Sequence, residues 1–375
     1  MDRRYFLYYS TVATAYLFTG CEEQNDMHKI DTHTHLSLEK TQNATDSMLK
    51  EITPFTEKLK IPREINFSQI RKAEFVAQKS QVNIFLNEQT GVLTFQGDLP
   101  NPTIRISNGD AFDLNFTNKL PDDTTIHWHG VIVPDDMDGH PKDAIAYNQA
   151  KHYHYMINQN AGTFWYHMHP HGKTGQQIYF GLSGFYIIED KIEKKLDLPK
   201  GEFELPLVIQ DRRFDEKYQL FYKDKNVIQD NNGVMGNVIL VNATPFPYHE
   251  VKTQKYRLRI LNGSSVRTYK LAFDNIEQFT LIGTDAGLIE EPISVNSIIL
   301  GVAERIDIII DFKDKNIGDA VTLKTLGFKD ASKLILNPDY PSFDAQMDII
   351  QFRIAQKIDN TATIPKKLTS MQRLK

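Results

Sequence analysis

Two short stretches of the sequence decide its fold: TIHWHG at residues 125–130 and FWYHMH at residues 164–169. In each stretch a His-x-His pair alternates with bulky apolar or aromatic residues, which is the period-two pattern of a β-strand. Residues two apart on a strand share a face and lie about 6–7 Å apart. The two stretches therefore predict two strands, each presenting two imidazoles on one face.

These four histidines, His127, His129, His167 and His169, are candidate metal ligands. Neutral imidazole is the commonest protein ligand for copper and zinc. Two such pairs on adjacent strands would bring four rings into one small volume, and a buried cluster of this kind is poorly satisfied without a metal. The aromatic neighbours would exclude water and fix the orientation of the rings. We therefore predict a metal site at this place.

A third pair, His152 and His154, alternates with Tyr153 and Tyr155. The tyrosines are the better core residues, so we expect these two histidines to face solvent. Another motif, DTHTH at residues 31–35, imitates the first-strand metal motif of amidohydrolases. That motif needs a barrel of strand–helix repeats, which the rest of the sequence does not supply. Weak metal scavenging by histidines in this region stays open as an alternative; they are His28, His33 and His35.

Short alternating runs continue on both sides of the histidine stretches. Ile104 and Ile106 precede Asn108-Gly109, and Phe112 starts the next alternating run, so we expect a hairpin there. A charged stretch with Pro199 at residues 191–201 reads as a linker, and a second strand-rich block of similar length follows it. The pattern predicts an all-β chain of two sandwiches in tandem, at residues 61–192 and 193–356.

Net charge and cysteine count exclude some classes of function and of metal site. The 375 residues hold 43 Lys and Arg against 48 Asp and Glu, a net charge of −5, which argues against a general nucleic-acid binder. Cys21 is the single cysteine, so no intramolecular disulfide can form. Any metal site that needs a thiolate must use Cys21 or do without one.

The first 21 residues read as an export signal. Arg3 and Arg4 precede an apolar stretch that is too short for a comfortable membrane span, and the start resembles a twin-arginine signal. Residues 18–21, FTGC, resemble a bacterial lipobox, so a lipid on Cys21 would be the chain's membrane contact. A plain cleaved signal with an incidental cysteine and a cytosolic chain are the alternatives. Residues 22–60 are polar and read as a tether.

The motifs around the histidines resemble those of multicopper oxidases. The segments HWHG at 127–130 and WYHMHPHG at 165–172 look like the first domain of that family. The continuations KTGQQ at 173–177 and GLSG at 181–184 resemble the bacterial copper-efflux oxidases, as do YRLRILNG at 256–263 and GVAER at 301–305. The resemblance covers roughly residues 75–356 and implies two of the family's three cupredoxin-like, Greek-key sandwiches.

The resemblance also implies roles for the site residues. His127 would bind the type 2 copper, His129 and His167 would share one type 3 copper, and His169 would bind the other. Asp138 matches the family acid that relays protons to the copper cluster; an ordinary turn acid is the alternative. His171 matches no ligand of the family.

The family also needs a type 1 copper, which takes electrons through a thiolate in a third domain. This sequence has no cysteine after residue 21 and no histidine after residue 249. We therefore expect residues 357–375 to be a truncated linker, and the chain alone to lack full turnover. A separate third-domain chain is one possible partner.

The leading hypothesis is a periplasmic multicopper oxidase polypeptide that oxidises a small electron donor, cuprous ion or a phenol-like compound, with dioxygen. Two alternatives stay open. One is an exported copper-binding module or truncated remnant without turnover. The other is a copper-free structural relative, like the cell-division proteins built from the same sandwiches.

Overall fold

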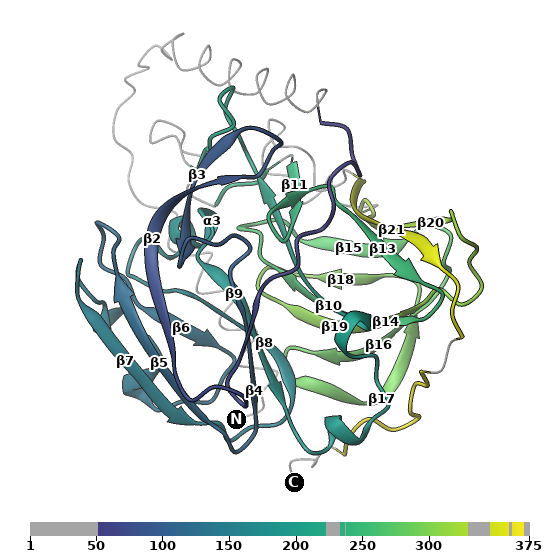
Figure 1. The fold of residues 1–375 in the computed structure, drawn as a ribbon, viewed down its shortest axis with the longest axis horizontal. Helices are drawn as coiled ribbons and strands as arrows, with labels where there is room; N and C mark the ends of the chain where they lie inside the picture. Colours follow the sequence, from purple (N-terminus) through teal and green to yellow (C-terminus); the bar gives the residue numbers. More distant parts are fainter. Residues whose placement is uncertain (1–51, 223–232, 237, 329–345, 360–361, 371–375) are drawn as a thin grey trace, which may run out of the picture. The chain divides into compact units, whose positions relative to one another are not determined.

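The computed structural model describes residues 52–222, 233–236, 238–328, 346–359 and 362–370. Regular structure in these ranges is almost entirely β-strand, which confirms the predicted all-β class (Figure 1). Strands β1–β9 form two sheets and β10–β21 form two more. The chain therefore folds as two successive β-sandwiches, which we call the N-terminal and the C-terminal sandwich.

The N-terminal sandwich packs a five-stranded sheet on a four-stranded one. The five-stranded sheet has the order β1 (Glu64–Asn66), β4 (Thr103–Ser107), β9 (Ser183–Glu189), β8 (Gly162–Met168) and β6 (Ile126–His129). The four-stranded sheet has the order β3 (Gln89–Phe95), β2 (Ala73–Asn83), β5 (Ala111–Asn118) and β7 (Ala150–Met156). β6 and β7 are thus edge strands of different sheets, and this decides where the histidines lie.

The C-terminal sandwich packs a seven-stranded sheet on a five-stranded one. The larger has the order β12 (Thr244–Pro245), β11 (Val238–Val241), β10 (Glu204–Arg212), β14 (Lys255–Asn262), β19 (Arg305–Asp311), β16 (Phe279–Thr284) and β17 (Gly287–Val295). The smaller has the order β13 (Tyr248–Lys252), β21 (Met347–Gln356), β20 (Ala320–Thr325), β15 (Tyr269–Phe273) and β18 (Ile298–Leu300).

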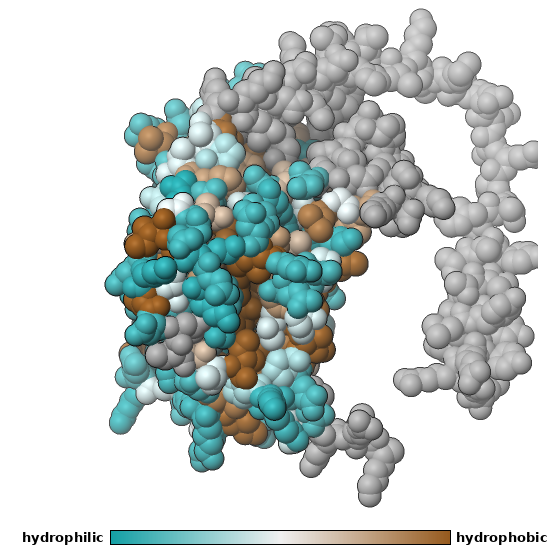
Figure 2. Space-filling view, turned by 90° about the vertical axis from the view of Figure 1, so that its right-hand side faces the viewer, coloured by the Kyte–Doolittle hydropathy of each residue, from teal (hydrophilic) through white to brown (hydrophobic). Residues whose placement is uncertain are grey.

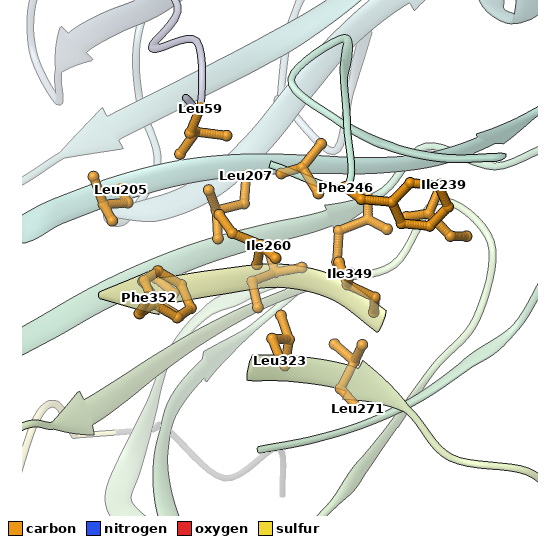
Figure 3. Packing of buried hydrophobic residues seen from close by; sticks show 14 of the residues in the cluster. Leu59, Leu205, Leu207, Ile239, Phe246, Ile260, Leu271, Leu323, Ile349 and Phe352 are labelled. Atoms are coloured by element: carbon orange, nitrogen blue, oxygen red, sulfur yellow. The ribbon is translucent and has the colours of Figure 1, made fainter. Parts of the chain in front are cut away.

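Alternating aliphatic residues of both sheets fill this second core. Figure 3 shows Leu207 and Ile260 of the larger sheet facing Leu271 and Leu323 of the smaller one, and all four are fully buried. Burial of one such side chain contributes about 1.5–3 kcal/mol. On the surface seen in Figure 2, hydrophilic residues predominate and hydrophobic ones gather in a band between them.

The hairpin expected at Asn108-Gly109 is wrong. The strands on either side, β4 and β5, belong to different sheets, so this turn is a corner where the chain crosses the sandwich. Gly109 has φ +95°, and its N–H bonds to Ile157 rather than across a two-residue hairpin loop. The chain does turn at Asn108-Gly109. Ile106 and Phe112 both point into the core, and strands of two facing sheets can bury them as well as two strands of one sheet can.

The last residues of the predicted tether pack on the C-terminal sandwich. The Phe55 N–H donates to Phe246 O and the Leu59 N–H donates to Tyr248 O, both at 2.8 Å. The Leu59 side chain is buried in the C-terminal core. A few residues later the same segment enters β1 of the N-terminal sandwich. Residues 55–66 therefore form a strap that contacts both sandwiches.

Helices in the described ranges are short: η1 (Asp135–Met137), η2 (Pro141–Asp143), α3 (Thr174–Tyr179), η3 (Glu193–Lys195) and η4 (Gly201–Phe203). None of them is long and apolar enough to span a membrane. The predicted export signal, lipobox and DTHTH motif lie outside the described residues.

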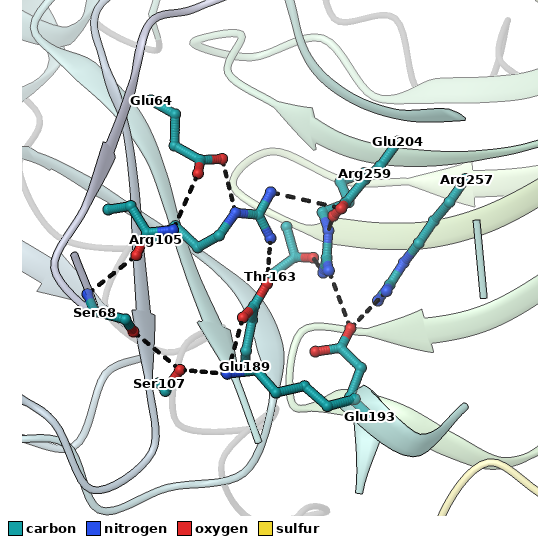
Figure 4. Close-up of polar contacts among 12 residues, drawn as sticks. Glu64, Ser68, Arg105, Ser107, Thr163, Glu189, Glu193, Glu204, Arg257 and Arg259 are labelled. Carbon is teal, nitrogen blue, oxygen red and sulfur yellow. Dashed lines mark hydrogen bonds and ion pairs between the residues drawn. The ribbon is translucent and has the colours of Figure 1, made fainter. Parts of the chain in front are cut away.

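A buried network of charges joins the two sandwiches (Figure 4). The Arg259 guanidinium of β14 donates to Thr163 Oγ1 of β8 at 2.8 Å and to Asp307 Oδ2 of β19 at 3.0 Å. It also donates to Glu193 Oε1 of the linker at 3.0 Å and pairs with Glu204 of β10. Since a buried charge is tolerated only when it is paired, these contacts fix the two sandwiches against each other.

Acid should weaken this network. Burial raises the pKa of Glu204, but the charges of Arg259 and Arg105 outweigh burial and lower that pKa from 4.5 to about 2. A carboxyl whose pKa is lowered by folding stabilises the protein above its unfolded pKa, and this contribution is lost as the pH falls toward the folded pKa. We therefore expect the free energy of unfolding, measured by urea melts, to fall between pH 4.5 and pH 2.

The matched variant is Glu204→Gln, which cannot take up the proton. It should be less stable than the native chain at pH 7 and should lose less stability over the same acid range. An acid slope as steep as that of the native chain would contradict the assignment to Glu204.

Candidate metal centre

Strands β6 and β8 place two histidine pairs side by side. They are antiparallel with His127 opposite His167, so the rings leave the same face of the sheet. Trp128 and Met168, the middle residues of the two His-x-His pairs, are fully buried on the opposite face, in the N-terminal core. The period-two pattern that predicted these strands therefore also separates the ligands from the core.

Three of the four predicted ligands converge closely. Each of His127, His129 and His167 offers one ring nitrogen, and these three atoms all lie within 4.8 Å of one another. His129 Nδ1 is 3.3 Å from His167 Nε2. An imidazole nitrogen lies about 2.0–2.1 Å from a zinc ion, so two nitrogens on one ion of that size are roughly 3–4 Å apart. The His129–His167 spacing thus fits a single shared ion.

A backbone carbonyl orients His167. Its Nδ1 is 2.9 Å from Met168 O, and a carbonyl can only accept, so Nδ1 carries the proton. Nε2 is then left with a free lone pair, and this is the nitrogen that faces His129. The hydrogen bond fixes the tautomer that a metal ligand needs.

Asp138 orients His127 in the same way. His127 Nδ1 is 2.9 Å from Asp138 O and 3.1 Å from Asp138 Oδ1. These contacts leave Nε2 of His127 free to bind an ion. Asp138 ends the short helix η1, and the following Gly139 packs its Cα directly on the backbone of β6. The carboxylate predicted to lie near the site therefore contacts a predicted ligand.

His169 lies beside this trio but is not part of it. Its ring centroid is 5.4 Å from that of His127 and 5.7 Å from that of His167. His169 Nδ1 is 3.3 Å from the hydroxyl of Thr174 on α3, which itself donates to Pro170 O. The proton between them then sits on Nδ1, and Nε2 is available for a second ion. His171 lies exposed in the following turn.

Burial keeps the central rings neutral. Burial lowers the pKa of His167 to about 3, and burial together with the Arg305 charge lowers the pKa of His129 to about 4. Burial also lowers the pKa of His169. At pH 7 these imidazoles are neutral, which is the form that binds a metal. Neutral, oriented nitrogen donors without a thiolate fit copper in the histidine-only positions that the resemblance implies.

Residues of the C-terminal sandwich pack against the strand β8 that carries His167. The Trp165 ring lies 4.2 Å from His167 and 5.0 Å from His129, centroid to centroid. Trp165 belongs to a small apolar cluster that includes Leu261 of β14. Arg305 of β19 donates to Thr163 O of β8 at 3.1 Å. Arg305 is the last residue of the motif GVAER, but the pattern of the motif gives no sign of this contact, which depends on how the two sandwiches pack.

The pair His152 and His154 does not join the centre. Both lie on β7, the edge of the other sheet, and both side chains are more than half exposed, as expected from the buried tyrosines between them. Their neighbour Asp113 was not singled out in the sequence.

Two β-sandwiches in tandem, with oriented imidazoles converging at the edge of the first, are the architecture of a cupredoxin-like protein with a candidate metal site. Sequence profiles described as multicopper oxidase match residues 76–193 and 207–319. The chain belongs to the multicopper oxidase family, and both predictions, the family and the paired cupredoxin-like sandwiches, are confirmed.

Individual relatives agree with this assignment. A laccase of Bacillus stratosphericus is 34% identical over 311 residues, which are 73% of this chain and 59% of the laccase. The cell division protein FtsP of Escherichia coli is 34% identical over 224 residues, 59% of this chain and 46% of FtsP. The crystal structure of the McoA multicopper oxidase from Aquifex aeolicus has a TM-score of 0.77 and 33% identity, covering 86% of this chain and 70% of McoA. The chain spans about half the length of the curated relatives it matches.

Proposed function

We propose that this chain is a polypeptide of an exported, copper-dependent oxidase. The reaction is oxidation of a small electron donor, cuprous ion or a phenol-like compound, with reduction of dioxygen to water. The observation that carries the proposal is the convergence of His127, His129 and His167, whose ligand nitrogens lie within 4.8 Å of one another. Family membership supplies the class of reaction, and this cluster is the feature that a purely structural sandwich does not require.

The ligand geometry supports the following assignment. His129 and His167 would hold one type 3 copper, since their facing nitrogens are 3.3 Å apart. His127, which Asp138 orients, would hold the type 2 copper, and His169, which lies near Thr174, would hold the other type 3 copper. Copper held by these histidines would supply the electron transfer to dioxygen. The protein's own part is to hold neutral imidazoles in fixed tautomers and to exclude water with Trp165.

Asp138 has a second role in this proposal. Reduction of dioxygen to water consumes protons, so the site needs a group that exchanges protons with solvent. The Asp138 carboxylate is 38% exposed while touching His127 Nδ1 at 3.1 Å, so it faces both solvent and the ligand cluster. We assign it the proton relay as well as the orientation of His127.

Electron entry of the family type needs a thiolate from outside residues 22–375, because Cys21 is the single cysteine of the sequence. We propose that a further domain or a separate third-domain chain supplies it. The domains are residues 61–192 with the histidine ligands and residues 193–356 without copper ligands, after an export signal at 1–21. A second candidate rests on the histidine cluster alone: an exported module that holds copper without turnover.

Copper binding tests the proposal. We expect the purified chain, dialysed against CuSO4, to retain copper, and His167→Asn to weaken retention by more than tenfold. Loss of a partner that merely orients a ligand costs about 10–100-fold in metal affinity, so loss of a ligand should cost at least as much. The measurement is copper per chain after equilibrium dialysis.

His171→Asn is the matched control, since His171 lies four residues further on and is exposed. It should retain copper like the native chain. If the native chain retains none at the β6–β8 cluster, the structural role of the FtsP-like relatives becomes the better assignment. Oxygen consumption with a cuprous donor separates the two copper candidates: uptake supports the oxidase, and copper retention without uptake supports the module.

A further inference from the structure

A second group of metal donors lies on the four-stranded sheet, apart from the β6–β8 cluster. His152 Nε2 is 2.9 Å from Asp113 Oδ1, and His154 Nδ1 is 3.3 Å from Asp113 Oδ2. One ligand atom from each of the three residues lies within 4.8 Å of the other two. The two imidazole rings are 5.8 Å apart, centroid to centroid.

The sheet itself brings these donors together. Tyr153 and Tyr155 are buried in the N-terminal core, so the alternate residues His152 and His154 share the outer face of β7. Asp113 of β5 stands directly opposite His154 in the antiparallel register. Side chains that share a face on such strands are within reach of one another. The arrangement is therefore a consequence of register and pleat, and does not depend on a loop.

We propose that Asp113, His152 and His154 form a surface binding site for a divalent transition-metal ion, with Cu²⁺ preferred. Two imidazoles and one carboxylate with open positions for water are a recognised ligand set for first-row metals. The ion takes the place of the proton between His152 Nε2 and Asp113 Oδ1, and His154 Nδ1 lies near enough to the carboxylate to bind the same ion. Affinity of such a nitrogen and oxygen site rises through the first row to a maximum at copper and falls again at zinc.

The surroundings bear on the choice of ion. The hydrogen bond from His152 is the main cause that lowers the pKa of Asp113, so the carboxylate is ionised at neutral pH. The positive charge of Lys72 lies near Asp113 and weakens the binding of any cation. The site therefore favours ions that bind imidazole tightly. The side chains of His152 and His154 are 53% and 55% exposed, so an ion reaches them directly from solvent. Met156, the next outward residue of β7, is also exposed.

The test is equilibrium dialysis of the full chain and its variants against CuSO4, and separately against ZnSO4, at pH 7. We expect His152→Asn/His154→Asn to bind one Cu²⁺ fewer per chain than the native protein. Asp113→Asn should weaken binding of that ion by about tenfold or more, because loss of a group that only orients a ligand already costs about that much and Asp113 is a ligand itself. Asn115→Ala/Thr117→Ala, on the same outer face of β5, is the control and should bind copper like the native chain.

One further double variant distinguishes this surface site from the β6–β8 cluster. In His127→Asn/His167→Asn the surface ion should remain; its loss there would overturn a separate site. An unchanged copper count in His152→Asn/His154→Asn would overturn the proposal, as would zinc bound more tightly than copper. Circular dichroism of each variant establishes that the sandwiches are folded. Loss of the ion can then be attributed to the removed ligand and not to unfolding.

Discussion

Replacing Arg259 with Met should lower the free energy of unfolding by about 3–5 kcal/mol, the cost of leaving a buried charge without its partner. Arg259 is 1% exposed and contacts three carboxylates, those of Glu193, Glu204 and Asp307. Met fills similar space but leaves these acids to the remaining arginines of the network. Because Arg259 also donates to Thr163, the loss should loosen the contact between the two sandwiches. Urea unfolding at pH 7 measures the effect.

Arg63→Met is the matched control, because it removes the same group at the surface. The Arg63 side chain is 52% exposed and its ion pair with Asp98 is 3.8 Å long. Exposed pairs of this kind contribute about 0–1 kcal/mol. A native-like midpoint for Arg259→Met, or equal losses in the two variants, would show that the network does not hold the sandwiches together.

Gly139→Ala should cost about 2–4 kcal/mol, of which overpacking accounts for about 1–3 kcal/mol and the left-handed backbone for about 1 kcal/mol. Gly139 has φ +73°, and a Cβ there would lie 1.6 Å from Ile126 O and 2.9 Å from His127 N. Backbone atoms of β6 cannot move aside as the end of a flexible side chain can. The strand that carries His127 must shift, and Asp138 with it. The midpoint temperature of thermal unfolding and the amount of copper bound per chain should therefore both fall.

Gly172→Ala separates the two causes. Gly172 also has a positive φ, +70°, but a Cβ there would meet nothing within 4 Å. It should lose only the backbone contribution of about 1 kcal/mol. If both variants lose the same stability, the close approach of Gly139 to β6 is not the cause.

Much of this fold could be predicted from local pattern. Alternation around His127 and His167 predicted two strands and put the aromatic residues inward, and Tyr153 predicted the exposed face of β7. The turn at Asn108-Gly109 shows the limit, because a turn signal does not say whether the next strand stays in the sheet or crosses the sandwich. Pattern within one strand also carries no information on its partner.

The same limit applies to the site residues. The sequence could nominate His127, His129, His167 and His169 as ligands, but their spacing depends on the register between β6 and β8. Asp113 lies 39 residues before His152, and only the pairing of β5 with β7 brings them together. In the sequence Arg259 is one basic residue of a predicted strand. Its buried contacts with β8, β19 and the linker depend on the tertiary fold.

The strap formed by residues 55–66 makes the two sandwiches unequal in what they need. Leu59 fills part of the C-terminal core, yet it precedes the whole N-terminal sandwich in the chain. Cutting the polypeptide in the linker near residue 200 would therefore not release two self-sufficient halves. The C-terminal half would lose the buried side chain of Leu59 from its core. The N-terminal half would carry Leu59 exposed to solvent. A protein that is split or recombined at this point must keep the leading segment with the half that follows the cut.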